Sequence, residues 1–218
     1  MLQKESLSKD RKKVPRSPDK HTRIINAALK VFAEKGFYNT RISEIAKEAN
    51  VADGTIYLYF KNKDDILISL FEEKIGNVCK AMQEELNKTE DPVARMRIFA
   101  HNHLNMILRN RNLAEVIQVE LRQSTKFMRQ YVNTIFKEYL NLVKTIVRDG
   151  QNMGIFRQDV PPGIIKRSFF GALDEMARYW IFSTSKKYPP EDSAKHISDI
   201  FIQGLLVHPG KIREKSKK

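Results

Sequence analysis

Two tyrosines and two lysines stand together in the stretch from Val51 to Asp65, VADGTIYLYFKNKDD, directly behind an Asp-Gly pair. Their place directly behind a turn signal raises the question of which structural element presents these polar and aromatic side chains. By local rules, Asp53-Gly54 predicts a hairpin turn and TIYLYF predicts a β-strand leaving it. No comparable strand runs into that turn, and a lone strand would leave its backbone unpaired.

The segment before the turn favours a different structure. Its residues RISEIAKEANV carry apolar side chains at steps of three and four, which predicts a short helix. Asn50 tolerates the left-handed conformation that the chain needs to turn. Two short helices joined by such a turn form a helix-turn-helix, in which Gly54 would let the backbone approach a phosphate. Val51 and Phe60 would then face the core, and the outward side chains would be Thr55, Tyr57 and Tyr59.

Other kinds of chemistry find little support. The chain has no G-x-S-x-G, no Walker-type phosphate loop and no H-E-x-x-H. His101 and His103 are two positions apart and so point to different faces of a helix, which argues against a shared metal ion. Cys79 is the only cysteine, which excludes an internal disulfide. We therefore expect neither an enzyme nor a cofactor.

Charge and composition narrow the list of partners. The 218 residues include 39 Lys and Arg against 26 Asp and Glu, for a net charge of +13. This surplus favours polyanionic partners, and much of it lies in segments 1–16 and 209–218, which we expect to be a flexible basic arm and a basic tail. The sequence has neither a signal peptide nor an apolar segment long enough to span a bilayer. A soluble cytoplasmic protein without a membrane partner is expected.

The apolar periodicity predicts an all-α fold in two parts. Residues 17–63 form a three-helix unit containing the helix-turn-helix, with Ser17 as the first N-cap and Thr40 capping the second helix. Residues 64–208 form a larger helical domain for ligand binding and dimerisation. We expect its helices at about 63–87, 92–108, 113–122, 125–153, 164–183 and up to about 207.

The N-terminal part resembles the DNA-binding domain of the TetR/AcrR family of transcriptional repressors. The resemblance covers Ile24 to Leu67 and includes Ala27-Ala28, Gly36-Phe37, Gly54-Thr55 and Tyr59-Phe60. It departs at Asn50, where the family usually has Gly, and at Ala52, where a Ser or Thr cap is usual and Asp53 would substitute in part. The resemblance implies that Ala52 to Lys61 is a recognition helix in the major groove. It also implies contacts to DNA from Thr40, Arg41, Ser43, Asp53, Gly54, Thr55, Tyr57, Tyr59, Lys61 and Lys63.

Repressors of this family are homodimers, so the resemblance also implies a dimer interface. The last two helices combine small residues with an apolar stripe, which suits an isologous contact. The candidates are Ser168, Gly171, Ala172, Phe201, Ile202 and Leu205. An internal core face is the alternative explanation for the same pattern.

The larger domain has residues that suit an effector with an acyl chain and a phosphorylated head, although an ordinary core with surface charges would look similar. The candidates are Leu113, Val116, Ile117, Glu120, Leu121, Arg122, Arg129, Phe170 and Asp174. The segments LAEVIQVELRQS and FFGALDEMARYW resemble those of the family's fatty-acid-degradation repressors. That resemblance implies release from operator DNA by long-chain acyl-CoA, with phosphates received by Arg122, Arg129, Lys126 or Lys186-Lys187.

Two alternatives remain open at this point. One is a regulator of efflux genes, in which Trp180, Phe170, Asp174 and Glu175 receive a lipophilic cation. The other is a protein that binds membrane surfaces through its basic tails and amphipathic helices, which would leave the helix-turn-helix unexplained.

Overall fold

The computed structural model describes residues 19–123, 132–185 and 187–207, and within them the chain is built from helices. The helices are α1 (Lys20–Lys35), α2 (Ile42–Ala49), α3 (Asp53–Ile56), α4 (Lys63–Leu86), α5 (Pro92–Arg109), α6 (Arg111–Gln123), α8 (Val132–Asn152), α9 (Pro162–Phe182) and α10 (Pro190–Leu205). The described part has no β-strand, only an isolated bridge between Phe156 and Leu206. The predicted all-α class is confirmed.

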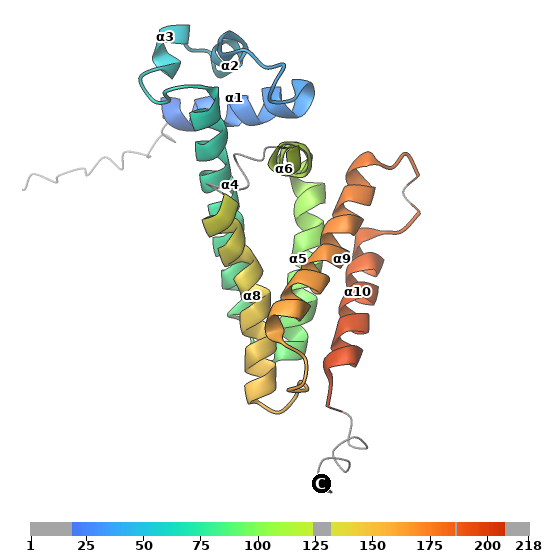
Figure 1. Cartoon of the computed structure of the whole chain (residues 1–218). Helices are drawn as coiled ribbons and strands as arrows, with labels where there is room; N and C mark the ends of the chain where they lie inside the picture. Colours follow the sequence, from blue (N-terminus) through green and yellow to red (C-terminus); the bar gives the residue numbers. More distant parts are fainter. Residues whose placement is uncertain (1–18, 124–131, 186, 208–218) are drawn as a thin grey trace, which may run out of the picture.

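Helices α1 to α3 form a small unit at one end of the molecule (Figure 1). The N-cap of α1 is Asp19, whose carboxylate accepts a hydrogen bond from the Thr22 backbone N–H at 2.8 Å. The predicted N-cap, Ser17, lies outside the described residues. The same hydrogen bond lowers the pKa of Asp19, because it stabilises the ionised carboxylate. The first helix thus begins about two residues later than the sequence suggested.

A left-handed residue ends α2, as the turn requires. Asn50 has φ 52° and ψ 55°, and its position at the C-cap was predicted from its tolerance of that conformation. Arg23 on α1 holds this end in place, because its guanidinium donates to the carbonyls of Ala49 and Asn50, both at 2.6 Å. These two carbonyls are helix-end acceptors that would otherwise need water.

The helix α4 is shared between two hydrophobic cores. Its first half buries Ile66, Leu70 and Phe71 against α1 and α2, whereas Met82 and Leu86 in its second half are buried among the C-terminal helices. Asn62 caps it by accepting the Asp65 N–H at 2.9 Å. The boundary expected at residues 63 and 64 therefore falls at the start of a continuous helix.

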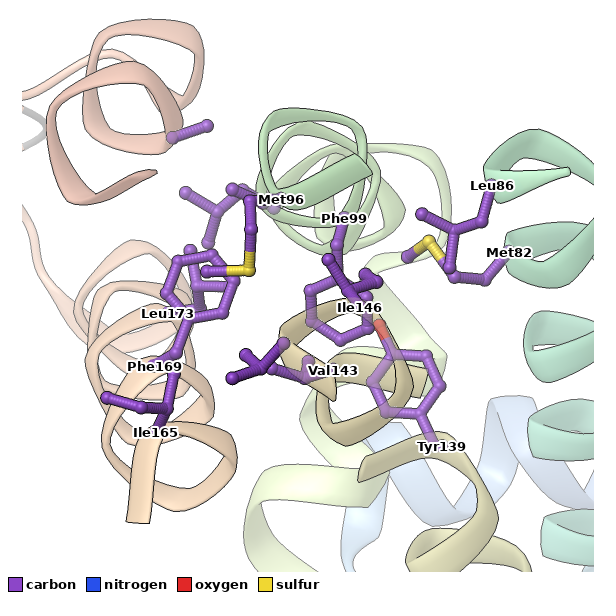
Figure 2. Close-up of a cluster of buried hydrophobic side chains, with 14 of the residues drawn as sticks. Met82, Leu86, Met96, Phe99, Tyr139, Val143, Ile146, Ile165, Phe169 and Leu173 are labelled. Atoms are coloured by element: carbon purple, nitrogen blue, oxygen red, sulfur yellow. The ribbon is translucent and has the colours of Figure 1, made fainter. Parts of the chain in front are cut away.

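The C-terminal core lies between α4, α5, α8, α9 and α10. Figure 2 shows its centre, where Phe99 on α5 faces Tyr139 and Val143 on α8 and lies near Phe169 on α9. The rings of Phe99 and Tyr139 are 5.2 Å apart. An ion pair of Arg95 with Asp149, at 2.8 Å, joins α5 to α8 at the edge of this core.

The end of α10 is fixed to the loop that follows α8. The Arg157 N–H donates to the Leu205 carbonyl at 2.8 Å, and the Val207 N–H donates to the Ile155 carbonyl at 3.1 Å. These bonds close the C-terminal bundle at the end opposite α1 to α3. None of the described helices is long and apolar enough to cross a membrane.

Candidate DNA-binding surface and effector site

The segment after the tight turn presents its tyrosines to solvent, as predicted. Tyr57 is 58% exposed and Tyr59 is 43% exposed, whereas the neighbouring Ile56 and Phe60 are buried in the core of the N-terminal unit. Arg41, Ser43 and Lys61 are also exposed. In the segment after the tight turn, buried Ile56 and Phe60 anchor the chain and the tyrosines between them are exposed.

The recognition helix is shorter than the sequence suggested. We expected a helix from Ala52 to Lys61, but α3 spans only Asp53–Ile56 and then continues as a turn. In that turn the Leu58 and Tyr59 N–H groups donate to carbonyls three residues earlier, at 3.2 and 3.0 Å. Ile56 and Phe60 are both buried, and the Phe60 N–H donates to the Ile56 carbonyl at 3.0 Å, which closes the turn.

The start of α3 has no side-chain cap. Ala52 occupies the N-cap and cannot supply one, and the carboxylate of Asp53 has no hydrogen-bond partner among the described residues. The expected substitution of Asp53 for the missing cap is therefore not seen. Gly54 is exposed, and a Cβ there would meet nothing within 4 Å. The backbone of this turn is thus open to approach.

Two residues expected to contact DNA have structural roles instead. Thr40 is buried, and its hydroxyl donates to the Gly36 carbonyl at 2.8 Å, so it neither caps α2 nor faces outward. The Lys63 ammonium donates to the carbonyls of Phe37, Tyr38 and Thr40 at 2.6, 3.1 and 2.9 Å. A lysine has three N–H donors, so none remains for a phosphate in this arrangement. Both expectations need this correction.

A further exposed aromatic residue escaped the sequence reasoning. Tyr38 is 70% exposed in the loop between α1 and α2, and its carbonyl accepts from Lys63. This anchoring places Tyr38 beside the start of α2, where Arg41 is exposed. Periodicity gives no signal for a loop residue, and only the resemblance of the neighbouring Gly36-Phe37 pair could have drawn attention to it.

The apolar stripe of α6 faces the N-terminal unit. Leu113 and Val116 are 3% and 1% exposed and belong to the core that α1, α2 and α4 build, with Ile117 packed beside them. These three residues pack against the N-terminal unit, and their predicted place at an effector site stays a prediction. Helix α6 is covered on two sides, and amphipathicity alone does not reveal which domain lies against which side.

The opposite side of α6 carries a buried polar contact to α9. Gln118 is 8% exposed, and its amide nitrogen donates to the Asp174 carboxylate at 2.6 Å. The amide oxygen of Gln118 is buried without a hydrogen-bond partner in the described part of the chain. An acceptor left bare in this way costs free energy that a bound donor would recover.

One turn away on α9, aromatic side chains surround a buried histidine. Phe170 lies edge to face with His103 on α5, at 5.4 Å, and with Phe136 on α8, at 5.2 Å. The Nδ1 atom of His103 is 2.9 Å from the Tyr139 hydroxyl, and within the described residues its Nε2 has no partner. Burial lowers the pKa of His103 to about 4 and raises that of Tyr139, so both groups are neutral. An apolar region with isolated polar atoms suits a largely apolar ligand.

The comparisons with known proteins agree with this arrangement. Residues 24–70 match the family described as bacterial regulatory proteins, tetR family. Residues 71–204 match the C-terminal region of YsiA-like proteins in the same group. The chain belongs to the tetR family. Members of the family are dimeric regulators that bind operator DNA through the helix-turn-helix.

Relatives within the tetR family are similar over nearly their whole length. The fatty acid metabolism regulator protein of Bacillus subtilis is 37% identical over 186 residues, which are 85% of this chain and 95% of the relative. The structure of Bacillus subtilis FadR in complex with stearoyl-CoA has a TM-score of 0.79 and 37% identity, covering 86% of this chain and 100% of that one. The fatty acid degradation regulator FadR of Bacillus halodurans has a TM-score of 0.80 and 36% identity, with 87% and 97% covered.

Some residues expected at the effector site lie outside the part of the chain that the structure describes. Glu120, Leu121 and Arg122 belong to α6, but their side chains lie outside the described part of the structure. Arg129 lies outside the described residues altogether, as do Lys126 and Lys186. Of the expected set, the structure brings Phe170 and Asp174 together on one side of α9.

The outer side of α9 and α10 remains the candidate dimer face. Ser168 and Gly171 are exposed and Ala172 is half-buried, as a helix contact in a tetR-family dimer would allow. Ile202 and Leu205 are each 1% exposed within the chain's own core, and Phe201 packs on Phe169 at 5.1 Å. The expectation for Ile202 and Leu205 is therefore wrong, because the apolar stripe of α10 faces α5 and α9. The large apolar side chains left on the outer side are Ile164, Phe182 and Ile200.

Proposed function

We propose that this chain is a homodimeric repressor of fatty-acid degradation genes that long-chain acyl-CoA releases from operator DNA. The observation that carries the proposal is 37% identity to a fatty acid metabolism regulator over 95% of that protein's length. The structure of Bacillus subtilis FadR was solved in complex with stearoyl-CoA, and it superimposes on 86% of this chain. The helix-turn-helix and the apolar region of the C-terminal domain supply the two sites that such a repressor needs.

The DNA-binding surface in this proposal is the exposed side of α2 and α3. Arg41, Ser43 and Lys61 contact phosphates, and Thr55 and Tyr57 reach base edges or sugars. Tyr59 and Tyr38 flank them. Thr40 and Lys63 support this surface from behind through their contacts with backbone carbonyls.

The dependence of DNA affinity on salt concentration distinguishes the role of Lys61 from that of Lys63. Removing one lysine–phosphate pair makes the plot of log affinity against log salt shallower by roughly 0.9. Because a homodimer loses one such pair in each subunit, Lys61→Gln should flatten the plot by roughly 1.8. Stability should not change, since the side chain is exposed. Lys63→Gln should leave the slope unchanged and lower the free energy of unfolding by roughly 1.5–3 kcal/mol, because its hydrogen bonds to carbonyls are charge-assisted. The reverse pattern would return Lys63 to the DNA surface.

The effector site in this proposal lies between α5, α6, α8 and α9. An acyl chain would run along Phe170 and Phe136, and polar atoms of the ligand would meet His103 Nε2 and Gln118 Oε1, which have no partners among the described residues. The rival interpretation as a sensor of lipophilic cations is weaker, because the relative that is 37% identical over most of the chain is a fatty acid metabolism regulator.

Helix α6 connects the two sites. Gln118 on one side contacts α9, and Leu113 and Val116 on the other side are buried against the N-terminal unit. A ligand that displaces α6 from α9 must therefore also disturb its packing against α1. The proposed mechanism is a shift between two arrangements of α6, of which only one holds the reading heads of the dimer at the spacing of the operator.

The test is binding to DNA from the protein's own promoter region, with and without stearoyl-CoA, at fixed salt. Stearate and CoA alone serve as controls. We expect stearoyl-CoA to release the protein and the two controls to leave the complex intact. Tight DNA binding that stearoyl-CoA does not change would refute the fatty-acid assignment and leave the regulator assignment in place.

A further inference from the structure

A histidine connects the first turn of α1 with the proposed DNA-binding surface. The centroid of the His21 ring is 5.1 Å from that of Phe60 and 6.1 Å from that of Tyr59, which it meets edge to face. Phe60 is buried in the core of the N-terminal unit, whereas Tyr59 is 43% exposed. His21 therefore packs against the segment that presents Tyr59 to solvent.

The same imidazole lies near an acidic residue of α4. Its Nδ1 atom is 3.9 Å from a carboxylate oxygen of Glu73, and the two side chains are 38% and 30% exposed. This distance is too long for a hydrogen bond but suits an ion pair once the ring is protonated. Glu73 also pairs with Lys74 at 3.2 Å, and the Lys74 ammonium donates to the side-chain oxygen of Asn26 on α1 at 2.7 Å. The contact of α1 with α4 thus has one charged link that depends on protonation of a histidine.

The charged groups around His21 are acidic on balance. On α1 the neighbour is Asp19, on whose carboxylate the charge of His21 acts. In the turn after α3 it is the Tyr59 side chain, and on α4 it is Glu73 with its partner Lys74. Histidine is the side chain whose charge ordinarily changes between pH 5 and 8. A change of pH within that range therefore switches the attraction between His21 and Glu73 on or off.

Protonation of His21 favours DNA binding in two ways. Without the charge, packing alone holds the imidazole near α4; with it, the pair with Glu73 ties His21 to α4, and the ring of His21 holds Tyr59 in place. A side chain that is already held in its binding position loses less conformational entropy when it meets a phosphate. The imidazolium is also an additional positive charge beside the surface that would carry DNA.

The other described histidines lie elsewhere in the molecule. His101 is exposed on α5 and His196 is exposed on α10. His103 is buried in the C-terminal domain, where its ring contacts Phe99 and Phe170. Within the described part of the chain, only His21 contacts the segment that carries the exposed tyrosines.

We propose that His21 is a positioning residue of the DNA-binding surface, which holds Tyr59 for contact with operator phosphates when its imidazole is protonated and paired with Glu73. DNA binding then takes up protons, and acidification within the range in which histidine titrates tightens the complex. The inference rests on the DNA-binding surface of the proposed function and does not depend on the identity of the effector. It adds a residue of α1 that the sequence patterns did not indicate.

The experiment measures the affinity of the full chain for operator DNA from its own promoter region, by fluorescence anisotropy at fixed salt and at about pH 5.5 and 7.5, on either side of the ordinary histidine titration. The variants are His21→Gln, His21→Arg, Glu73→Gln and Tyr59→Phe. His101→Gln is the control for loss of a histidine, and Glu72→Gln is the control for loss of a carboxylate at an exposed neighbouring position. Urea unfolding and sedimentation at both pH values report on the fold and the dimer.

The wild type should bind the operator about tenfold more tightly at the lower pH. A partly exposed ion pair changes an equilibrium by roughly two- to fivefold, and a homodimer has two such pairs. His21→Gln, Glu73→Gln and Tyr59→Phe should each reduce the ratio to about twofold or less. His21→Arg, which stays charged, should bind at both pH values about as tightly as the wild type at the lower one. His101→Gln and Glu72→Gln should keep the ratio of the wild type.

Several results would overturn the proposal. An affinity of the wild type that does not change with pH would refute it, as would a ratio that His21→Gln leaves intact. An undiminished ratio in Glu73→Gln would refute the pair with α4. An undiminished ratio in Tyr59→Phe would show that the imidazolium acts on phosphates by its charge alone and not by positioning Tyr59. Weak binding of His21→Arg at both pH values would show that only the shape of the imidazole matters.

This experiment also separates the inference from the proposed function. The assay contains no acyl-CoA, so failure of stearoyl-CoA to release the operator would refute the fatty-acid assignment and leave the pH profile as evidence for His21. Release by stearoyl-CoA together with a flat pH profile would support the proposed function and refute the role of His21. Absence of DNA binding at both pH values would refute the DNA-binding surface and this inference with it.

Discussion

Replacing Leu113 by alanine should uncouple the effector from DNA more than it damages the fold. Leu113 is 3% exposed and lies in the core that α6 shares with α1 and α4. Truncating such a leucine costs roughly 2–5 kcal/mol of stability. Domains of ordinary stability, about 5–15 kcal/mol, tolerate this decrease and remain folded at low temperature.

The expected change in coupling follows from the same packing. Effectors of this kind typically change affinity by roughly 5- to 150-fold. If about 1.4 kcal/mol of the Leu113 contribution is present in only one of the two arrangements of α6, its removal changes the effector response by about tenfold. The protein should still bind its operator, because no residue of the DNA-binding surface has changed.

Leu104→Ala is the matched control. Leu104 is 1% exposed on α5 and belongs only to the C-terminal core, so its truncation should cost a similar free energy of unfolding. The assay combines urea unfolding of both variants with operator binding by fluorescence anisotropy across a stearoyl-CoA titration. Leu113→Ala should lose effector response, and Leu104→Ala should keep it to within about twofold. Equal responses in the two variants would refute transmission through α6.

Three further outcomes are expected. Gly150→Ala should destabilise the fold strongly, because a Cβ at Gly150 would lie 2.1 Å from a buried phenylalanine ring. Gly76 has open space around it, so Gly76→Ala should raise the free energy of unfolding by about 0.5–1 kcal/mol. Urea unfolding compares the two variants. Lowering the pH from 6.5 to about 4 should remove up to roughly 3 kcal/mol of stability, because only the unfolded chain protonates His103 in that window. In pH-dependent unfolding, His103→Phe should abolish that slope and His101→Phe, at an exposed position, should keep it. Ile200→Asp, at a residue 70% exposed on the outer side of α10, should yield monomers in sedimentation with an unchanged core, and a stable dimer would contradict the proposed face.

The sequence predicted the helices well where apolar periodicity is long. The bounds expected for α4 and α5 agree with the structure to within a residue or two, because Asp91 caps α5 in front of a proline and Leu86 ends a strong apolar stripe. The resemblance to a helix-turn-helix correctly overrode the strand-like TIYLYF. The length of the recognition helix was overestimated, because α3 ends at Ile56 and the chain continues as a turn.

The errors at the sites have a common physical origin. An apolar stripe reveals that a side of a helix is buried but not what buries it. It could therefore not show that Leu113 and Val116 pack on the N-terminal unit, or that Ile202 packs inside the chain's own core. The role of Lys63 depends on carbonyls 23 to 26 residues earlier in the chain.

The continuity of α4 has a mechanical consequence. Its 24 residues make a rod about 36 Å long that is buried in the N-terminal core at one end and in the C-terminal core at the other. A tilt of only about 6° around its far end would carry the near end through roughly 4 Å, on simple helix geometry. In a symmetric dimer the two displacements add. Under the proposed function, a small tilt of this rod would change the spacing of the two reading heads without any unfolding.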